Sequence, residues 1–309
     1  MEDVQKLLTD YELVETRPVC LLRESSDNEV FVVGEKDKKI LRISKRLPIE
    51  DIKFEYEAIE YLFKQGLPVP RLARTKSDSF YTLSNGAVAV VFNFLSGHHI
   101  QVDKNHLPTT TQAFNAGKGL GLLSNKAIDF VPSAPRKRNI FSELERALTL
   151  SDVFIKDFEG GEKFINEVGA VIDFAKSQKE TTGLIHNDYR PSNVFFNDND
   201  EITGIIDFDW SCVGPIVKDL ALAVVEWSFP DGQTEADFTI FDAFLDGYNS
   251  VADTKWKKDK KLYSWIRFVT LSDTATYFCD LADTLDLNKQ IIKSYMYQKY
   301  LFFRYESEL

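Results

Sequence analysis

The spacing of apolar and polar residues predicts a strand-rich beginning to this chain. Short alternating runs separated by polar turns over residues 19–43 predict a meander of three strands. Apolar residues at helical spacing over residues 49–65, ended by Gly66, predict one helix. Two more apolar runs, at residues 80–83 and 87–95, predict a hairpin. Together these elements predict a small lobe of five strands and one helix.

The remainder of the chain is predicted to be mostly helical. Helical periodicities lie at residues 109–123, 140–148, 158–178 and 218–227, and again after residue 236. The exception is a strand-rich island at residues 182–211. No internal repeat or long flexible linker interrupts the sequence. We therefore predict an α+β fold with a small lobe at residues 1–94 and a larger helical lobe at residues 95–309.

Polar residues gather at the strand ends of the island. Its apolar strands, residues 194–196 and 202–206, flank an acidic turn. His186, Asp188, Arg190 and Asn193 precede the first strand, and Asp207 and Asp209 follow the second. Phosphoryl transfer requires a carboxylate to orient the acceptor hydroxyl, oxygen ligands for Mg²⁺, and positive charge on the phosphates. The island carries all three kinds of residue and is therefore the candidate site.

Composition narrows the class of protein and of partner. The 309 residues are 44% hydrophobic and 28% charged, which is ordinary for a globular protein. The 37 basic and 48 acidic residues leave a formal charge of -11, which disfavours nucleic acid or an anionic membrane as the main partner. That charge suits a cationic small substrate; acidity that serves only solubility is the alternative interpretation.

The cysteines and the start of the chain bear on location. Cys20, Cys212 and Cys279 are scattered and have no metal-ligand spacing, which favours a reducing cytoplasm. The first ten residues carry acids rather than a basic, apolar leader, and no apolar run is long enough to span a bilayer. We therefore expect an unprocessed cytoplasmic protein.

The sequence of the island resembles a known family. HNDYRPSN is similar to the HRDxxxxN catalytic loop of protein kinases, and IIDFD stands where they carry the metal-binding DFG. The closer resemblance is to the aminoglycoside phosphotransferase and choline kinase-like superfamily. Within it, GLIHNDYRPSNVFF, TGIIDFDWSC, KDLALAVVEW and FLDGYNSV look most like the type II homoserine kinase branch. The resemblance implies a bilobal, protein-kinase-like fold that uses ATP and Mg²⁺ to phosphorylate a small alcohol.

The resemblance also implies roles for the island residues. Asp188 would be the catalytic base, and Asn193 and Asp207 would hold Mg²⁺ between the phosphates. Arg190 would either reach the transferred phosphate or form a plain salt bridge. Asp209 would be either a further metal ligand or a substrate contact. His186 is expected to pack under the loop, and Asp219 in KDLA is expected to brace the loop through hydrogen bonds.

In the small lobe, which would bind the nucleotide, the resemblance places a cation beside the phosphates. Arg42 in LRIS stands where protein kinases carry lysine, and Glu55 on the apolar face of the first helix is its expected partner. Glu57 is the alternative partner if the alignment slips by two residues.

Two further segments of the small lobe are expected to contact ATP. Ser25, Ser26 and Asn28 fill the turn where protein kinases carry a glycine-rich loop, which is absent here. Their hydroxyls and amides would either hold phosphate oxygens or form no more than a hairpin turn. The strand VVFNFLSGHH resembles the hinge between lobes. Its backbone at Asn93, Phe94 and Leu95 would hydrogen-bond adenine, with Val91 and Phe92 lining the pocket.

The acceptor pocket is expected to be acidic and aromatic. Candidate acids are Asp209, Glu226, Asp273 and Asp280, and the aromatic residues near them in sequence are Trp210, Trp227, Tyr277 and Phe278. Carboxylates beside aromatic rings suit an ammonium group, so we hypothesise an acceptor with both a hydroxyl and an amine. The alternative is that the acids lie on solvated helix faces and the aromatic residues lie in the core.

Two other functions compete with a small-molecule kinase. A pseudokinase-like module would bind nucleotide without turnover, but Asp188, Asn193 and Asp207 are all present, which disfavours it. A kinase acting on proteins would need an activation segment after the metal site. Here IIDFDWSCVGPIVKDL passes almost directly into a helical pattern.

Overall fold

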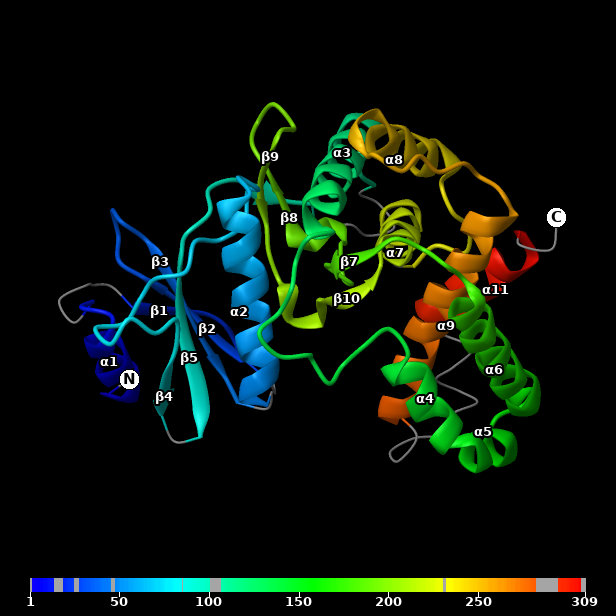
Figure 1. The fold of residues 1–309 in the computed structure, drawn as a ribbon, viewed down its shortest axis with the longest axis horizontal. Coiled ribbons are helices and arrows are strands. Elements are labelled where there is room, and N and C mark those ends of the chain that lie inside the picture. The colour runs from blue at the N-terminus through cyan, green and yellow to red at the C-terminus, as the bar shows by residue number, and fades with distance from the viewer. Residues whose placement is uncertain are drawn as a thin grey trace.

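The computed structural model describes residues 2–13, 19–24, 28–45, 48–84, 86–100, 107–229, 232–281 and 294–306. Figure 1 shows a sheet at the N-terminal end, with helix α2 (Ile49–Lys64) between it and a larger helical lobe that contains the C-terminus. The predicted bilobal α+β architecture is therefore confirmed.

The small lobe is built on one antiparallel sheet. Its strands are β1 (Val19–Glu24), β2 (Asn28–Val33), β3 (Lys39–Ser44), β4 (Thr82–Ser84) and β5 (Ala87–Asn93), in the order β1-β2-β3-β5-β4. The meander and the hairpin were both predicted. Because neighbouring residues of a strand face opposite sides, Val90 and Phe92 join the core on the α2 side while Ala89 and Val91 join the core on the other side.

Helix α1 (Glu2–Asp10) covers that other side and was not predicted. Leu7 and Leu8 are buried in the same core cluster as Val91. Just after the helix, the Tyr11 hydroxyl donates to the carbonyls of Phe80 and Ala89 at 2.9 and 3.0 Å. The described part of the small lobe thus has two helices where one was expected, because nine residues give too short a pattern to identify.

The large lobe is mostly helical, as predicted. Its helices are α3 (Thr110–Ala127), α4 (Ser142–Thr149), α5 (Ser151–Asp157), α6 (Gly161–Ser177), α7 (Ile216–Ser228), α8 (Phe238–Val251), α9 (Lys260–Leu281) and α11 (Tyr295–Glu306). Helix α5 was missed, and α6 begins three residues later than expected. In Figure 1, α9 and α11 lie side by side next to α6 and α7.

The island forms two small antiparallel sheets between α2 and the helices of the large lobe (Figure 1). One sheet pairs β7 (Thr182–Ile185) with β10 (Cys212–Pro215), and the other joins β6 (His98–His99), β8 (Val194–Phe196) and β9 (Ile202–Ile205). Strands β8 and β9 were predicted. Pairing of β7 with β10 places the residues just before the loop at residues 186–193 beside the residues just after the turn at residues 207–211. The pairing thus fixes this loop and this turn relative to each other.

Helices α3 and α8 pack closely enough to require glycine. A Cβ on Gly117 of α3 would lie 2.0 Å from the Phe244 carbonyl oxygen, and one on Gly247 of α8 would lie 1.9 Å from that of Phe114. This packing supports the island, because the Tyr189 hydroxyl donates to the carbonyl of Ala116 on α3 at 3.0 Å.

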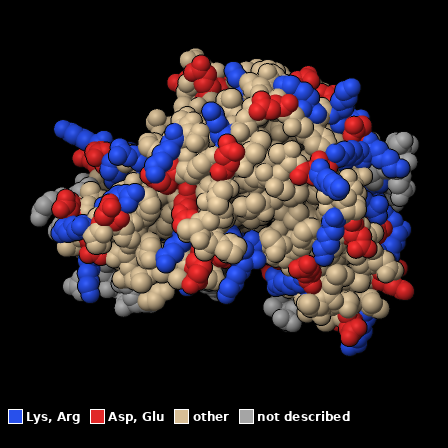
Figure 2. Space-filling model, viewed as in Figure 1, with Lys and Arg blue, Asp and Glu red and all other residues tan. Residues whose placement is uncertain are grey.

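Among the residues that the structure describes, no helix is long and apolar enough to cross a membrane. On the face shown in Figure 2, basic and acidic side chains are interspersed rather than gathered by sign.

We predict that Gly117→Ala lowers the free energy of unfolding by about 2 kcal/mol or more, because the added methyl group overlaps the backbone of α8. The matched control is Gly169→Ala on α6, where a Cβ would meet nothing within 4 Å. It should raise the free energy of unfolding by up to about 1 kcal/mol through helix propensity. Urea denaturation measures both changes, and equal effects of the two substitutions would contradict the close packing.

Candidate functional site

The loop from His186 to Asn193 lies between β7 and β8 and begins on a buried histidine. The Nε2 of His186 donates to the Ile206 carbonyl at 2.9 Å, and its ring lies 4.5 Å from that of Phe208, centroid to centroid. Burial lowers the pKa of His186, so the ring is neutral. The predicted packing role of His186 under the loop is confirmed.

Asp219 holds the first two residues of this loop through hydrogen bonds. Its carboxylate accepts the backbone amides of His186 and Asn187, each at 2.7 Å. Asn187 has a φ of 63°, in the left-handed region, and its side chain is held by Lys218 and by the Trp210 carbonyl. The predicted bracing by Asp219 is confirmed, and the contact from Lys218 was not foreseen.

These contacts to His186 and Asn187 orient Asp188, the residue that follows Asn187. Its Oδ1 accepts from Nε of Arg190 at 2.6 Å, and its Oδ2 accepts from Nδ2 of Asn193 at 2.9 Å. The side chain is 15% exposed. Burial raises the pKa of Asp188 to about 7. Arg190 opposes this rise, and the nearby acids Glu226 and Asp207 add to it. Both carboxylate oxygens are therefore oriented, in a group whose pKa suits proton transfer near neutral pH.

Two aspartates follow β9, Asp207 just before and Asp209 within the short helical turn Phe208–Trp210. Asp207 precedes this turn with a φ of 68°, a backbone conformation that a non-glycine residue adopts at a cost. Asp209 has a buried Oδ1 without a hydrogen-bond partner among the described residues. Burial, Asp207 and Glu55 raise the pKa of Asp209 well above its usual range. The surplus of buried negative charge fits a divalent cation, to which these aspartates and the Asn193 amide oxygen would be hard oxygen ligands.

Arg42, the cation expected to bind the nucleotide phosphates, lies near this turn. Arg42 Nη2 pairs with Glu55 Oε2 at 2.6 Å, both side chains being mostly buried, and its guanidinium carbon lies 5.5 Å from the centroid of the Phe92 ring. The predicted Arg42 and Glu55 pair is confirmed. Glu57 instead accepts from the backbone and side chain of Ser133, so the alternative pairing is wrong.

Arg136 connects the two lobes at this point and was not singled out from the sequence. It donates to the backbone carbonyls of Asp209 and of Ser211, the latter at 2.6 Å, and its Nε lies 3.8 Å from Oδ1 of Asp51 on α2. Asp51 is one helical turn before Glu55. The acidic turn at residues 207–210 and helix α2, which carries Glu55, are thus both bound to one buried guanidinium.

The expected nucleotide contacts are only partly described. Ser25 and Ser26 lie outside the described residues, and Asn28 accepts from Ser44 at 2.7 Å. In the expected hinge, the Asn93 and Phe94 amides donate to the carbonyls of Arg71 and Lys38, and only the Leu95 amide lacks a partner among the described residues. Val91 was wrongly expected to line the same pocket as Phe92, because successive residues of a strand face opposite sides.

The four acids expected around the acceptor do not converge. Glu226 on α7 and Asp273 on α9 both face the ammonium of Lys299 on α11. Asp280 is exposed and pairs with Arg146 of α4 at 2.7 Å, and Asp209 lies among Asp207, Glu55 and Arg42 instead.

The aromatic part of that expectation is also corrected. Trp227 is fully buried between Phe196 and Phe244, and Phe278 is fully buried among other phenylalanines. Both are core residues, as the alternative interpretation stated. Trp210 stacks instead against the guanidinium of Arg138, 3.9 Å from its ring centroid.

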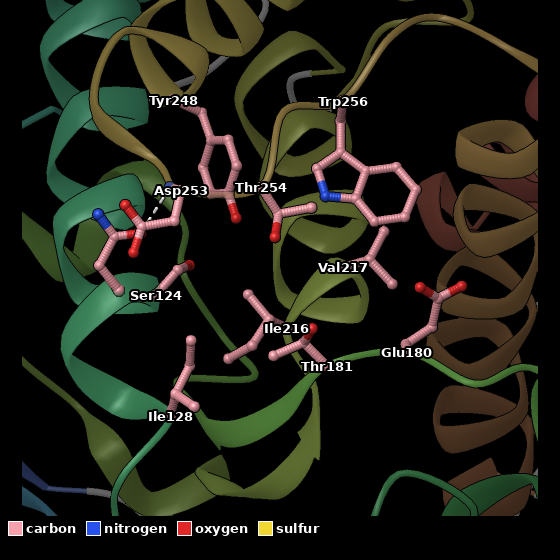
Figure 3. A pocket seen from close by; sticks show the side chains of 11 residues that line it. Ser124, Ile128, Glu180, Thr181, Ile216, Val217, Tyr248, Asp253, Thr254 and Trp256 are labelled. Carbon is pink, nitrogen blue, oxygen red and sulfur yellow. Dashed lines mark hydrogen bonds between the residues drawn. The ribbon is translucent and has the colours of Figure 1, made fainter.

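A separate small cavity lies between the ends of α3, α7 and α8 and the start of β7 (Figure 3). Its volume is about 30 Å³, enough for a water molecule, and Ser124, Thr181 and Asp253 are among its lining residues. It shares no residue with the site around Asp188.

Comparisons with known proteins agree with this geometry. The family model described as "Phosphotransferase enzyme family" matches residues 19–254. The homoserine kinase of Caulobacter vibrioides is 28% identical over 256 residues, covering 80% of this chain and 77% of that protein.

Solved structures show the same fold. An amicoumacin kinase in complex with AMP-PNP and Ca²⁺ superposes with a TM-score of 0.69 at 18% identity, covering 94% of this chain and 87% of that one. A microcompartment-associated aminopropanol kinase has a TM-score of 0.69 at 17% identity, covering 99% and 98%. The predicted resemblance to this superfamily and to homoserine kinases is confirmed.

We predict that Asp219→Asn lowers the free energy of unfolding by roughly 2–4 kcal/mol, because one of two buried backbone amides loses its acceptor and faces an NH₂ group. The control is Asp198→Asn in the exposed turn after β8, which should change the free energy of unfolding by less than about 0.5 kcal/mol. Chemical denaturation followed by circular dichroism measures both. Equal stability of the two variants would contradict the bracing role.

Proposed function

This chain belongs to the phosphotransferase enzyme family, and we propose that it transfers the γ-phosphate of ATP to a hydroxyl group of a small molecule that also carries an amine. The observation that carries the proposal is the oriented carboxylate of Asp188, held by Arg190 and Asn193. Asp209 lies close enough to interact with this carboxylate and with the Arg42 and Glu55 pair.

The nucleotide would be held by the small lobe and the acidic turn. In the small lobe, residues 1–94, Arg42 would bind the phosphates. Adenine would bind to the amide of Leu95, the first residue of the large lobe. That lobe, residues 95–309, would supply the remaining groups. Asn193 and Asp207 would hold Mg²⁺, with Asp209 as a third oxygen donor rather than an acceptor contact, the other role expected of it. When bound, the metal ion neutralises charge on the phosphates.

Asp188 would act on the acceptor. The acceptor oxygen bonds to the γ-phosphorus, the bond from that phosphorus to ADP breaks, and the hydroxyl proton passes to the Asp188 carboxylate. Arg190 and Asn193 fix the carboxylate, so its orientation is set before the acceptor arrives. Arg190 is 31% exposed, and we propose that it also contacts the transferred phosphate.

An amine on the acceptor is favoured by one carboxylate in particular. Glu226 is 7% exposed and closely bound by Lys299, whereas Asp273 is 23% exposed and stands 3.5 Å from the same ammonium. Asp273 therefore remains the acid best placed for a second, incoming ammonium group. The names of the relatives point the same way, since homoserine and aminopropanol are both amino alcohols.

Nucleotide binding without turnover is the second candidate function. It would need a disabled site, yet the base, its orienting amide and the acidic turn are all in place. A cytoplasmic location is part of the proposal, in keeping with the free thiols of Cys20, Cys212 and Cys279.

The experiment that tests the proposed function is a coupled ADP-release screen. Homoserine, choline, ethanolamine and an aminoglycoside are compared with glycerol and uncharged sugars at matched concentrations, with Asp188→Asn as the background. We expect release that depends on an amino alcohol and is weakened by Asp273→Asn. Preference for uncharged alcohols would refute the amine, and no acceptor-dependent release with any compound would favour the binding module.

We predict that Asp188→Asn keeps ATP affinity within a few-fold and lowers turnover roughly 100-fold or more, because the proton acceptor is lost while the nucleotide contacts remain. Calorimetry with a non-hydrolysable ATP analogue and steady-state kinetics measure the two quantities. Near-normal turnover would remove Asp188 from its role.

We predict an absolute requirement for a divalent cation. Asp207→Ala should abolish metal-dependent nucleotide binding, since hard oxygen ligands hold this ion with the phosphates. Arg42→Ala should instead weaken nucleotide binding and leave the metal requirement intact. Nucleotide-binding titrations with and without chelator distinguish the variants, and full activity in excess chelator would refute the prediction.

A further inference from the structure

Helix α11 places a buried ammonium beside the acids of the large lobe. The Nζ of Lys299 bonds to Oε1 of Glu226, lies 3.5 Å from Oδ2 of Asp273, and stands 4.6 Å from the centroid of the Tyr295 ring. The Lys299 side chain has no exposed surface. We expected an acceptor amine to bind between carboxylates and an aromatic ring. In the structure, the ammonium group of Lys299 has these surroundings.

Glu226 links this ammonium to the site. One of its oxygens takes Lys299, and the other lies 3.9 Å from Nε of Arg190. Arg190 in turn bonds to Oδ1 of Asp188 through Nε at 2.6 Å and Nη2 at 2.5 Å. Four charges of alternating sign therefore run from α11 through α7 to the loop that carries Asp188.

The position of Arg190 depends on how Glu226 is neutralised. The guanidinium stands between two carboxylates, in close contact with Asp188 and at a longer distance from Glu226. Although burial opposes the charged form, Lys299 and Arg190 hold the pKa of Glu226 below its usual range, so Glu226 is ionised. A buried carboxylate that lost Lys299 would draw the neighbouring guanidinium toward itself.

We propose that Lys299 is a positioning residue for phosphoryl transfer: by neutralising Glu226, it leaves Arg190 bound to Asp188 and so keeps the Asp188 carboxylate oriented. Lys299 touches neither nucleotide nor acceptor in this role. It acts through Glu226 and Arg190.

Helix α11 has other attachments, so a substitution at Lys299 need not release it. The Tyr300 hydroxyl donates to Glu167 of α6, and Arg304 lies 2.9 Å from the same carboxylate. Thr274 of α9 donates to the Met296 carbonyl at 3.1 Å. Tyr300→Phe therefore offers a matched control that weakens docking of the same helix without touching the chain of charges.

The test compares Lys299→Met, Lys299→Met with Glu226→Gln, Lys299→Arg and Tyr300→Phe. We expect Lys299→Met to lower kcat about 10-fold or more while KM for ATP changes less than about threefold. Adding Glu226→Gln removes the uncompensated charge and should recover most of the lost kcat, and Lys299→Arg should retain most of it. Tyr300→Phe should lower the melting temperature and leave kcat unchanged. Wild-type kcat in Lys299→Met, or a loss that Glu226→Gln does not relieve, would overturn the proposal.

The kinetic readout rests on the proposed function, so a second readout is independent of activity. The Nε–H signal of Arg190 is followed by NMR in protein labelled with ¹⁵N-arginine and assigned with Arg190→Lys. It should shift in Lys299→Met and return toward its wild-type position when Glu226→Gln is added. If the wild-type chain phosphorylates no alcohol, the proposed function fails and this signal alone decides the role of Lys299. An unmoved Arg190 signal would overturn that role.

Discussion

The structure depends on keeping one ionisable carboxylate, that of Asp188, in a place where little water reaches it. A carboxylate in such a place is stable only when its oxygens are bound and its surroundings carry compensating charge. Arg190 and Asn193 bind the two oxygens. The strained backbone of Asn187 that aims the side chain is held in turn by Asp219. The close helix packing and the paired island strands serve to hold this arrangement still.

The same constraint explains why distant segments meet at the site. Arg136 joins the acidic turn to the helix that carries Glu55, so this turn and the small-lobe helix are fixed relative to each other by one buried side chain. Lys299 performs the corresponding task for Glu226 on the far side. Arg136 also lies near the buried carboxylate of Asp51, and Lys299 compensates the buried charge of Glu226. Buried charge thus connects the two lobes and the C-terminal helix into one site.

Local patterns predicted the strands of the island, since these follow from the spacing of apolar residues. The bracing by Asp219 and the pairing of Arg42 with Glu55 were predicted from the family resemblance, helped for Glu55 by its place on the apolar face of a helix. The partners of Arg136 and Lys299 could not be found that way, because each lies more than 70 residues from the group it binds. The acceptor acids were misjudged for the same reason: Asp273 and Asp280 share a helix, yet one faces α11 and the other α4. Val91 was a different error, in which strand alternation was overlooked.

We propose above all that the carboxylate of Asp188 promotes transfer of a phosphoryl group from ATP to an alcohol. Phosphorus NMR of the wild-type protein with ATP, Mg²⁺ and an amino alcohol tests it most directly, because it identifies the product as well as the loss of ATP. We expect a phosphate monoester signal that increases in proportion to the ADP signal, with no comparable monoester signal from Asp188→Asn. Inorganic phosphate without an ester, or an ester formed equally fast by Asp188→Asn, would contradict it.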